Sequence, residues 1–122
     1  MATAEWNTGC MAIPKEERIE QIQEYLVEKF HLPREQISEM LPNFIGALVS
    51  HMDKLDVAFR SGDLIALGRA GHTMKGALLN LGINDCVDIA FELEQKGKAM
   101  DTTTDYSALL GELRERLGGL IR

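Results

Sequence analysis

The stretch SGDLIALGRAGHTMKGALLNLGIND, residues 61–85, decides the fold that we expect for this chain. Gly62 can adopt the left-handed conformation that closes one helix, and Asp63 can cap the helix that follows. From 64 to 81 the apolar residues recur at helical spacing, whereas no window of the chain alternates as a half-buried strand would. The stretch therefore predicts one helix that ends at the glycine and a second helix over about 64–81.

The C-terminal end of this second helix has the same kind of stop and start signals. Gly82 should end it, and Asn84 should cap another helix over about 85–99. Because the connection between the two helices is short, they should pack side by side and run antiparallel.

Two more helices precede this pair and one follows it. Pro14 suits the first turn of a helix over about 14–30. The stretch over about 34–60 contains Pro42, which predicts a kink or a short helix followed by a longer one. The segment TTTD at 102–105 can cap a last helix that runs to about 120. In the first helix one apolar stripe is expected to face the core: Ile19, Ile22, Leu26 and Phe30.

These elements predict an all-α fold, an up-down antiparallel four-helix bundle with an additional N-terminal helix. We expect residues 1–13 to form a flexible tail and residues 14–122 to form one helical bundle domain. The predicted connections are too short to hold a second domain.

Composition and charge are those of one ordinary globular domain. The chain has 122 residues, of which 45% are hydrophobic and 26% charged, enough for a single modest core. The net charge of −6 argues against a general affinity for nucleic acid. Cys10 and Cys86 have neither CxxC nor zinc-finger spacing, so we expect free thiols. Nothing resembles a signal peptide or a membrane span, and we expect a cytoplasmic monomer.

One histidine of the helix over about 64–81 faces away from the core. At about 100° per residue, the apolar residues of this helix cluster within about 80° of one another, and His72 lies on the order of 140° from their centre. A lone outward histidine is usually a solvated surface residue, so whether His72 belongs to a functional site must be judged from its neighbours. The predicted core face consists of Leu64, Leu67, Gly71, Met74 and Leu78.

The neighbours of His72 suggest a site for a partner. Ile65 and Leu79 are apolar but have no core to fill, and Gly68 and Gly76 leave the backbone bare. Each glycine costs about 1 kcal/mol relative to alanine inside a helix. The glycines serve either tight helix packing or the close approach of something bulky. We predict a partner-docking face that consists of Ile65, Gly68, Arg69, Gly76 and Leu79.

A carboxylate should lie opposite the histidine. His72 is eleven residues before Ile83, the centre of the turn, and Glu94 is eleven residues after it. Both helices rise about 1.5 Å per residue, so antiparallel packing brings His72 and Glu94 to the same height. Glu94 belongs to an apparently inward stripe with Val87, Ala90 and Phe91.

A buried carboxylate needs a partner, and two arrangements are open. Glu94 could accept a hydrogen bond from Nδ1–H of His72, which would leave Nε2 with a free lone pair, the nucleophilic form. Alternatively, Glu94 forms a salt bridge with Lys75 or Lys98.

The motif His72-Thr73-Met74-Lys75-Gly76 resembles the HxxKG motif of the histidine-containing phosphotransfer (HPt) domain family. LPNFIGALVSHMDKLDVAFRSGD at 41–63, NLG at 80–82 and ELE at 92–94 extend the resemblance to about residues 34–120. It implies His72 as phosphoacceptor, Lys75 as charge partner, Gly76 as clearance position and Glu94 as hydrogen-bond acceptor for His72. Gly71 departs from the usual alanine, and some members have glutamine where Glu94 stands.

The resemblance implies a phosphoryl carrier in a two-component phosphorelay. Neutral Nε2 of His72 would accept the phosphoryl group from a receiver-domain aspartyl phosphate and pass it to another receiver aspartate. The partners would be response-regulator receiver domains and a hybrid sensor histidine kinase. Mg²⁺ would belong to the receiver, and we expect no cofactor or metal of the chain's own. No GxxxxGK[ST] or kinase glycine loop is present, so we expect no ATP-dependent kinase activity.

Two alternatives stay open at this stage. The chain could be a docking module that binds receiver domains without accepting phosphate, although the intact histidine argues against it. It could also be a metal-binding bundle that uses His72 and Glu94. Two ligands are too few, and neither His31 nor His51 has a spacing that completes the set, so both are expected at the surface.

Overall fold

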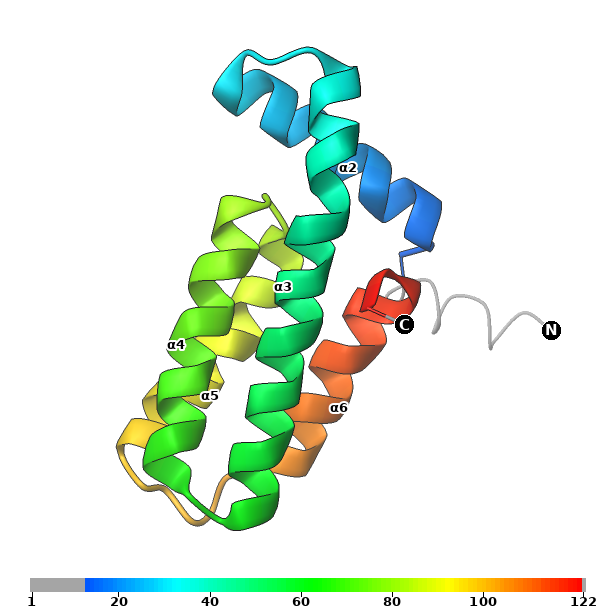
Figure 1. Cartoon of the computed structure of the whole chain (residues 1–122). Helices are drawn as coiled ribbons and strands as arrows, with labels where there is room; N and C mark the ends of the chain where they lie inside the picture. The colour runs from blue at the N-terminus through cyan, green and yellow to red at the C-terminus, as the bar shows by residue number, and fades with distance from the viewer. Residues whose placement is uncertain (1–12, 122) are drawn as a thin grey trace, which may run out of the picture.

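The computed structural model describes residues 13–121, in which all the regular structure is helical and no strand is present (Figure 1). The all-α prediction is therefore confirmed for this part of the chain. The tail predicted over 1–13 lies outside the described residues except for Ile13, as does Cys10. The α-helices are α2 (Lys15–Phe30), α3 (Arg34–Ser61), α4 (Leu64–Asn80), α5 (Val87–Lys98) and α6 (Tyr106–Leu117), and the short 3-10 helices are η1 (Asn84–Cys86) and η2 (Gly118–Ile121).

The predicted stop and start signals around α4 are confirmed. Gly62 follows α3 with a φ of 74°, and Gly82 follows α4 with a φ of 72°. Both angles lie in the left-handed region, which glycine enters without steric cost. The Asp63 carboxylate accepts a hydrogen bond from the backbone N–H of Ala66 at 3.0 Å. Local sequence signals therefore determine where α4 begins and where it ends.

One local prediction was wrong, at Asn84, and one of the two outcomes expected at Pro42 is excluded. Asn84 does not cap α5 with its side chain, because it begins η1 instead and α5 starts only at Val87. This extra turn lets the chain bury both Ile83 and Cys86. Of the two outcomes expected at Pro42, a kink or a division into two helices, the division is excluded, because α3 runs as one helix of 28 residues through the proline. The proline is exposed, and buried leucines before and after it hold both halves of the helix on the core.

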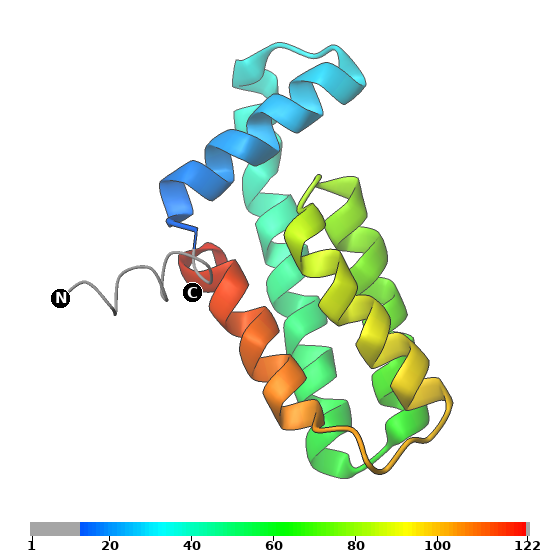
Figure 2. The ribbon, with the colours of Figure 1, turned by 180° about the vertical axis from the view of Figure 1, so that it is seen from behind.

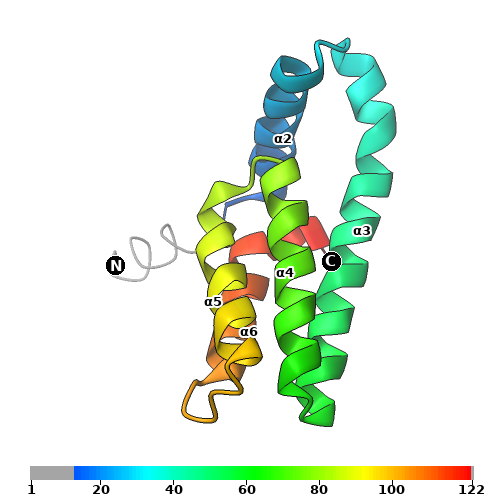
Figure 3. The same cartoon turned by 90° about the vertical axis from the view of Figure 1, so that its left-hand side faces the viewer.

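The helices α3, α4, α5 and α6 lie side by side, and α2 crosses one end of them (Figures 2 and 3). The α4 helix packs against α3 and α5, and α6 packs against the same two helices from the other side. The core lies between them. On α4, Leu67, Met74 and Leu78 are fully buried, as predicted. None of the helices in residues 13–121 is both long and apolar enough to cross a membrane.

The α2 helix packs on the rest of the protein along most of its length but not at its C-terminal end. Ile22 and Leu26 are buried as predicted, but Phe30 is 47% exposed. The last turn of α2, which carries Phe30, lies beyond the ends of α4 and α5, where no core can cover it (Figure 1). Arg18, which carried no prediction, is buried and donates two hydrogen bonds to the carboxylate of Asp85, at 2.7 and 3.0 Å. This hydrogen bonding lowers the pKa of Asp85 and compensates the buried charge.

Candidate functional site

His72 projects from the middle of α4 away from the core, as predicted. Its side chain is 62% exposed, and its Nδ1 atom lies 2.8 Å from Oε2 of Glu94 on α5. The Glu94 side chain is only 11% exposed, although its helix is on the surface. The predicted match in height between His72 and Glu94 is therefore confirmed, and the two side chains are in hydrogen-bond contact.

Glu94 also contacts two ammonium groups. Nζ of Lys75 lies 2.8 Å from Oε1, and Nζ of Lys98 donates to Oε2 at 3.0 Å. The hydrogen bond to His72 and the salt bridges to Lys75 and Lys98, which the sequence left as alternatives, thus occur together. Lys75 is the largest cause that lowers the pKa of Glu94 to about 2, and Lys98 and His72 add to it against the opposing effect of burial. Glu94 is therefore a carboxylate at neutral pH.

The charge of Glu94 determines which nitrogen of His72 is free. An ionised carboxylate can only accept hydrogen bonds, so Nδ1 of the imidazole must be the donor in this contact. In a neutral imidazole the other nitrogen, Nε2, then carries the lone pair. Because the ring is largely exposed, Nε2 can be reached by a group that approaches α4 from solvent.

Glycines bring the backbones of α4 and α5 close together beside this contact. A Cβ atom on Gly97 would lie 2.6 Å from the backbone nitrogen of Gly68, and one on Gly71 would lie 2.8 Å from the backbone nitrogen of Glu94. Gly68 was predicted on the exposed docking face, and this prediction was wrong. Gly68 is buried against α5, so it serves helix packing, which the sequence had left as the alternative. Gly97 was missed because its role depends on the facing helix.

Substitution by alanine should have opposite effects on stability at the packed Gly97 and at the open Gly76. Gly97→Ala should lower the free energy of unfolding by about 1–3 kcal/mol, because the new methyl group meets the backbone of α4 and forces the helices apart. Gly76→Ala should raise it by about 0.5–1 kcal/mol, because no atom lies within 4 Å of the added Cβ and alanine is the better helix former. Thermal or urea unfolding of the two variants tests this. Equal effects at both positions would contradict the packing role.

The remaining residues of the predicted docking face lie on the outer side of α4 with His72. Ile65 is half-buried, Arg69 is exposed, and Gly76 faces open space. Leu79 is 46% exposed. Without Gly68, the face that surrounds the imidazole thus contains two apolar side chains, one cation and one bare backbone position.

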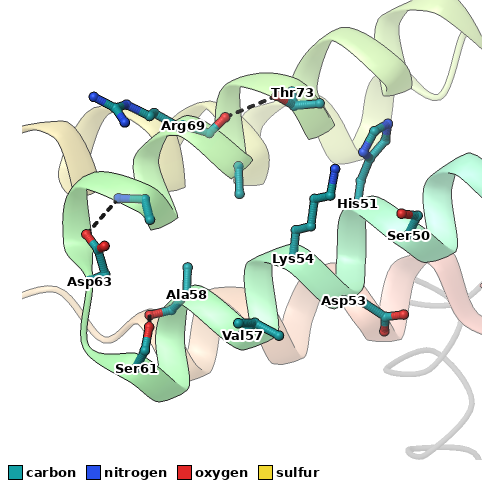
Figure 4. A pocket seen from close by; sticks show the side chains of 12 residues that line it. Ser50, His51, Asp53, Lys54, Val57, Ala58, Ser61, Asp63, Arg69 and Thr73 are labelled. Atoms are coloured by element: carbon teal, nitrogen blue, oxygen red, sulfur yellow. Dashed lines mark hydrogen bonds between the residues drawn. The ribbon is translucent and has the colours of Figure 1, made fainter.

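A groove between α3 and α4 adjoins this face (Figure 4). Arg69 and Thr73, the residues three before and one after His72, line its α4 side. His51 and Lys54 line its α3 side, and Figure 4 shows both side chains pointing from α3 toward α4. This groove could not be predicted from the sequence, because it depends on the distance between α3 and α4.

His51 is less exposed than predicted. It is half-buried in the groove, and its Nδ1 atom is buried without a hydrogen-bond partner among residues 13–121. Burial, with a smaller effect from the charge of Lys54, lowers the pKa of His51. Because it lacks a carboxylate partner like that of His72, His51 is a natural comparison for the candidate site. His31 is exposed, as predicted.

Phe91 lies beside the site and was assigned to the wrong face. It was predicted on the inward stripe of α5 but is 43% exposed. Ala90 and Glu94 are buried as predicted, and the other buried residues of α5 are Ile89, Leu93 and Gly97. Nζ of Lys75 lies 4.9 Å from the centre of the Phe91 ring, a cation–π distance. Lys75 is thus held between Phe91 and Glu94.

The metal-binding alternative gains no further ligands from the fold. Within the part of the chain that the structure describes, no three histidine, cysteine or acidic side chains come together as metal ligands would. The alternative therefore rests on His72 and Glu94, and Glu94 is already in contact with two ammonium groups.

These features together define a helical protein with an exposed imidazole whose second nitrogen is held by a buried carboxylate. The family model of the Hpt domain matches residues 39–121, which is more than half of the chain and includes His72 and Glu94. The chain therefore belongs to the Hpt domain family, whose members are phosphocarrier modules of two-component signalling and interact with receiver domains and kinases. No curated protein and no solved structure matches the chain.

Proposed function

We propose that this chain accepts a phosphoryl group on Nε2 of His72 from a receiver-domain aspartyl phosphate and passes it to the aspartate of another receiver. The observation that carries the proposal is the 2.8 Å contact between Nδ1 of the exposed imidazole and the buried carboxylate of Glu94. This contact orients the ring and selects the tautomer in which Nε2 is nucleophilic.

In the transfer step, the Nε2 lone pair attacks the phosphorus atom in line with the bond to the aspartyl oxygen. The P–N bond forms, the P–O bond breaks, and the aspartate leaves as a carboxylate. The imidazole ring becomes positively charged, and its Nδ1–H group still donates to Glu94, so the carboxylate stabilises the charge that develops on the ring. Transfer to the next receiver reverses these bond changes.

Lys75 supplies positive charge close to the reacting group. It lies one turn after His72 on α4, and its ammonium group contacts Glu94 and the Phe91 ring. The phosphoryl oxygens on Nε2 would attract this ammonium group in competition with Glu94. The proposal assigns Mg²⁺ to the receiver, which supplies the acyl phosphate, and gives the chain no ATP-dependent step of its own. A hybrid sensor histidine kinase is the expected source of the receiver.

We further infer the arrangement expected from the sequence, with α3, α4, α5 and α6 as an up-down four-helix bundle and α2 as the additional helix. Their packing in pairs around a common core supports this description. In this arrangement α4 carries the reactive side chain and α5 carries the carboxylate that orients it.

The experiment that tests the proposal is direct transfer. The chain is mixed with a panel of receiver domains that carry a labelled aspartyl phosphate, and the label on the chain is followed. Phosphohistidine is labile in acid and stable in base, so the label should have both properties. Receivers that bind the chain but never label it would instead support the docking-module alternative.

The proposal assigns receiver docking to the outer face of α4, with Ile65, Arg69, Gly76 and Leu79, and to the adjoining groove. Gly76→Gln should slow transfer about tenfold or more without loss of stability, because its side chain would stand one turn from His72, where the reacting atoms must come within about 3–3.5 Å. Transfer rates and thermal melts measure the two effects. Gly111→Gln, at an equally open glycine on α6, should leave the rate unchanged.

Leu79→Lys provides a second test of the same face. It should weaken receiver binding and leave the fold intact, because the leucine is exposed and has no core contact to lose. Phe59→Lys, at an exposed aromatic residue that lines a hollow between α3 and α6, is the control and should not change binding. If both lysine variants bind the receiver like the wild type, the docking face lies elsewhere.

A further inference from the structure

Lys98 shares one oxygen atom with the proposed phosphoacceptor. Oε2 of Glu94 accepts from Nδ1 of His72 at 2.8 Å and from Nζ of Lys98 at 3.0 Å. Lys98 lies one turn after Glu94 on α5, and half of its side chain is exposed. An ion pair of this spacing on a helix surface contributes little to stability. Because this ion pair lies next to the imidazole, its effect should be on the site rather than on stability.

The packing of α4 and α5 directs Lys98 toward this position. A Cβ atom on Gly68 would lie 2.7 Å from the backbone nitrogen of Lys98 and 3.0 Å from its Cγ atom. The first part of the Lys98 side chain therefore lies against α4 where Gly68 has no side chain. A Cβ atom at position 68 would crowd both the backbone and the side chain of Lys98. The glycine thus creates the space that lets Lys98 reach the oxygen bound to His72.

Lys98 also changes the net charge of the site. Glu94 carries one negative charge, and the ammonium groups of Lys75 and Lys98 carry two positive charges. With a neutral imidazole, the cluster has one net positive charge. With Lys75 alone, the contact cluster around Glu94 would have no net charge, so Lys98 makes this cluster positive, in addition to the charge that Arg69 carries on the outer face of α4.

We infer that Lys98 is a positioning residue for phosphotransfer, which holds the Glu94 carboxylate against His72 and gives the site the positive charge that a phosphoryl group requires. This inference rests on the proposed function. It predicts that Lys98 acts through Glu94, so its removal should change both the titration of Glu94 and the rate of transfer.

The test compares three variants with the wild-type chain. Lys98→Gln should slow transfer from a phosphorylated receiver about threefold to tenfold, because one charge-assisted contact to Glu94 is lost. Lys98→Arg keeps the charge and should restore most of the rate. Lys96→Gln removes a lysine from the same helix whose Nζ atom is 3.8 Å from Asp101 rather than near Glu94, so it should leave the rate unchanged.

A carboxyl NMR titration adds a readout that does not depend on transfer. In the wild type the pKa of Glu94 is about 2, and it should rise in Lys98→Gln but not in Lys96→Gln. Label on the wild-type chain, together with an unchanged rate and an unchanged Glu94 titration in Lys98→Gln, would overturn the role of Lys98 and leave the proposed function intact. Absence of label on the wild-type chain would overturn the proposed function and this role together.

Discussion

His72→Gln should take no label from a phosphorylated receiver that labels the wild-type chain. Glutamine retains a polar side chain of moderate size, but its amide nitrogen has no lone pair available to attack phosphorus. The fold should survive, because the imidazole is 62% exposed and contributes no core contact. Gel autoradiography after a fixed incubation measures the loss, and thermal melts of both proteins confirm that the variant is folded.

His51→Gln is the matched control for this experiment. His51 also projects from a helix and lines the neighbouring groove, but no carboxylate of residues 13–121 contacts its ring. This variant should still accept label. Label that persists in His72→Gln and disappears in His51→Gln would move the acceptor to α3 and contradict the central assignment.

Glu94→Ala should slow transfer by about tenfold to a thousandfold, the range expected for a group that orients or assists a proton-bearing nucleophile. Alanine leaves Nδ1 of His72 without its acceptor, so both the ring orientation and the tautomer become mixed. The variant should remain folded, because the two lysines that lose their partner can reach solvent. Single-turnover transfer from one receiver gives the rate.

Two further variants separate the functions of Glu94. Glu94→Gln keeps an oxygen that can accept from Nδ1–H but removes the charge, so it should transfer within about tenfold of the wild type. Glu92→Ala removes an exposed carboxylate from the same helix and should have no effect. If Glu94→Ala transfers at the wild-type rate while His72 remains essential, Glu94 is only a structural residue.

Much of the site was accessible from the sequence because it depends on geometry within single helices. The direction in which His72 points follows from the helical period. His72 and Glu94 lie at the same height because the two antiparallel helices have the same rise per residue and are joined by a short turn. The cap at Asp63 and the left-handed glycine at 62 are local events as well. These predictions required no knowledge of how far apart the helices lie.

The tertiary structure alone decided how neighbouring helices occupy the flanks of α4. Gly68 lies four residues before His72 and Gly76 lies four residues after it. Nevertheless, Gly68 is buried against α5, whereas Gly76 faces open space. The exposure of Phe91 and the contact of Lys75 on α4 with Glu94 on α5 have the same origin. The pattern of one helix specifies directions about its own axis, but the distance and rotation of the facing helix follow from packing of both surfaces together. For this reason the sequence by itself determined that an outward imidazole lies opposite a carboxylate, whereas only the packed structure decided which glycines join the helices and which of the two lysines contact that carboxylate.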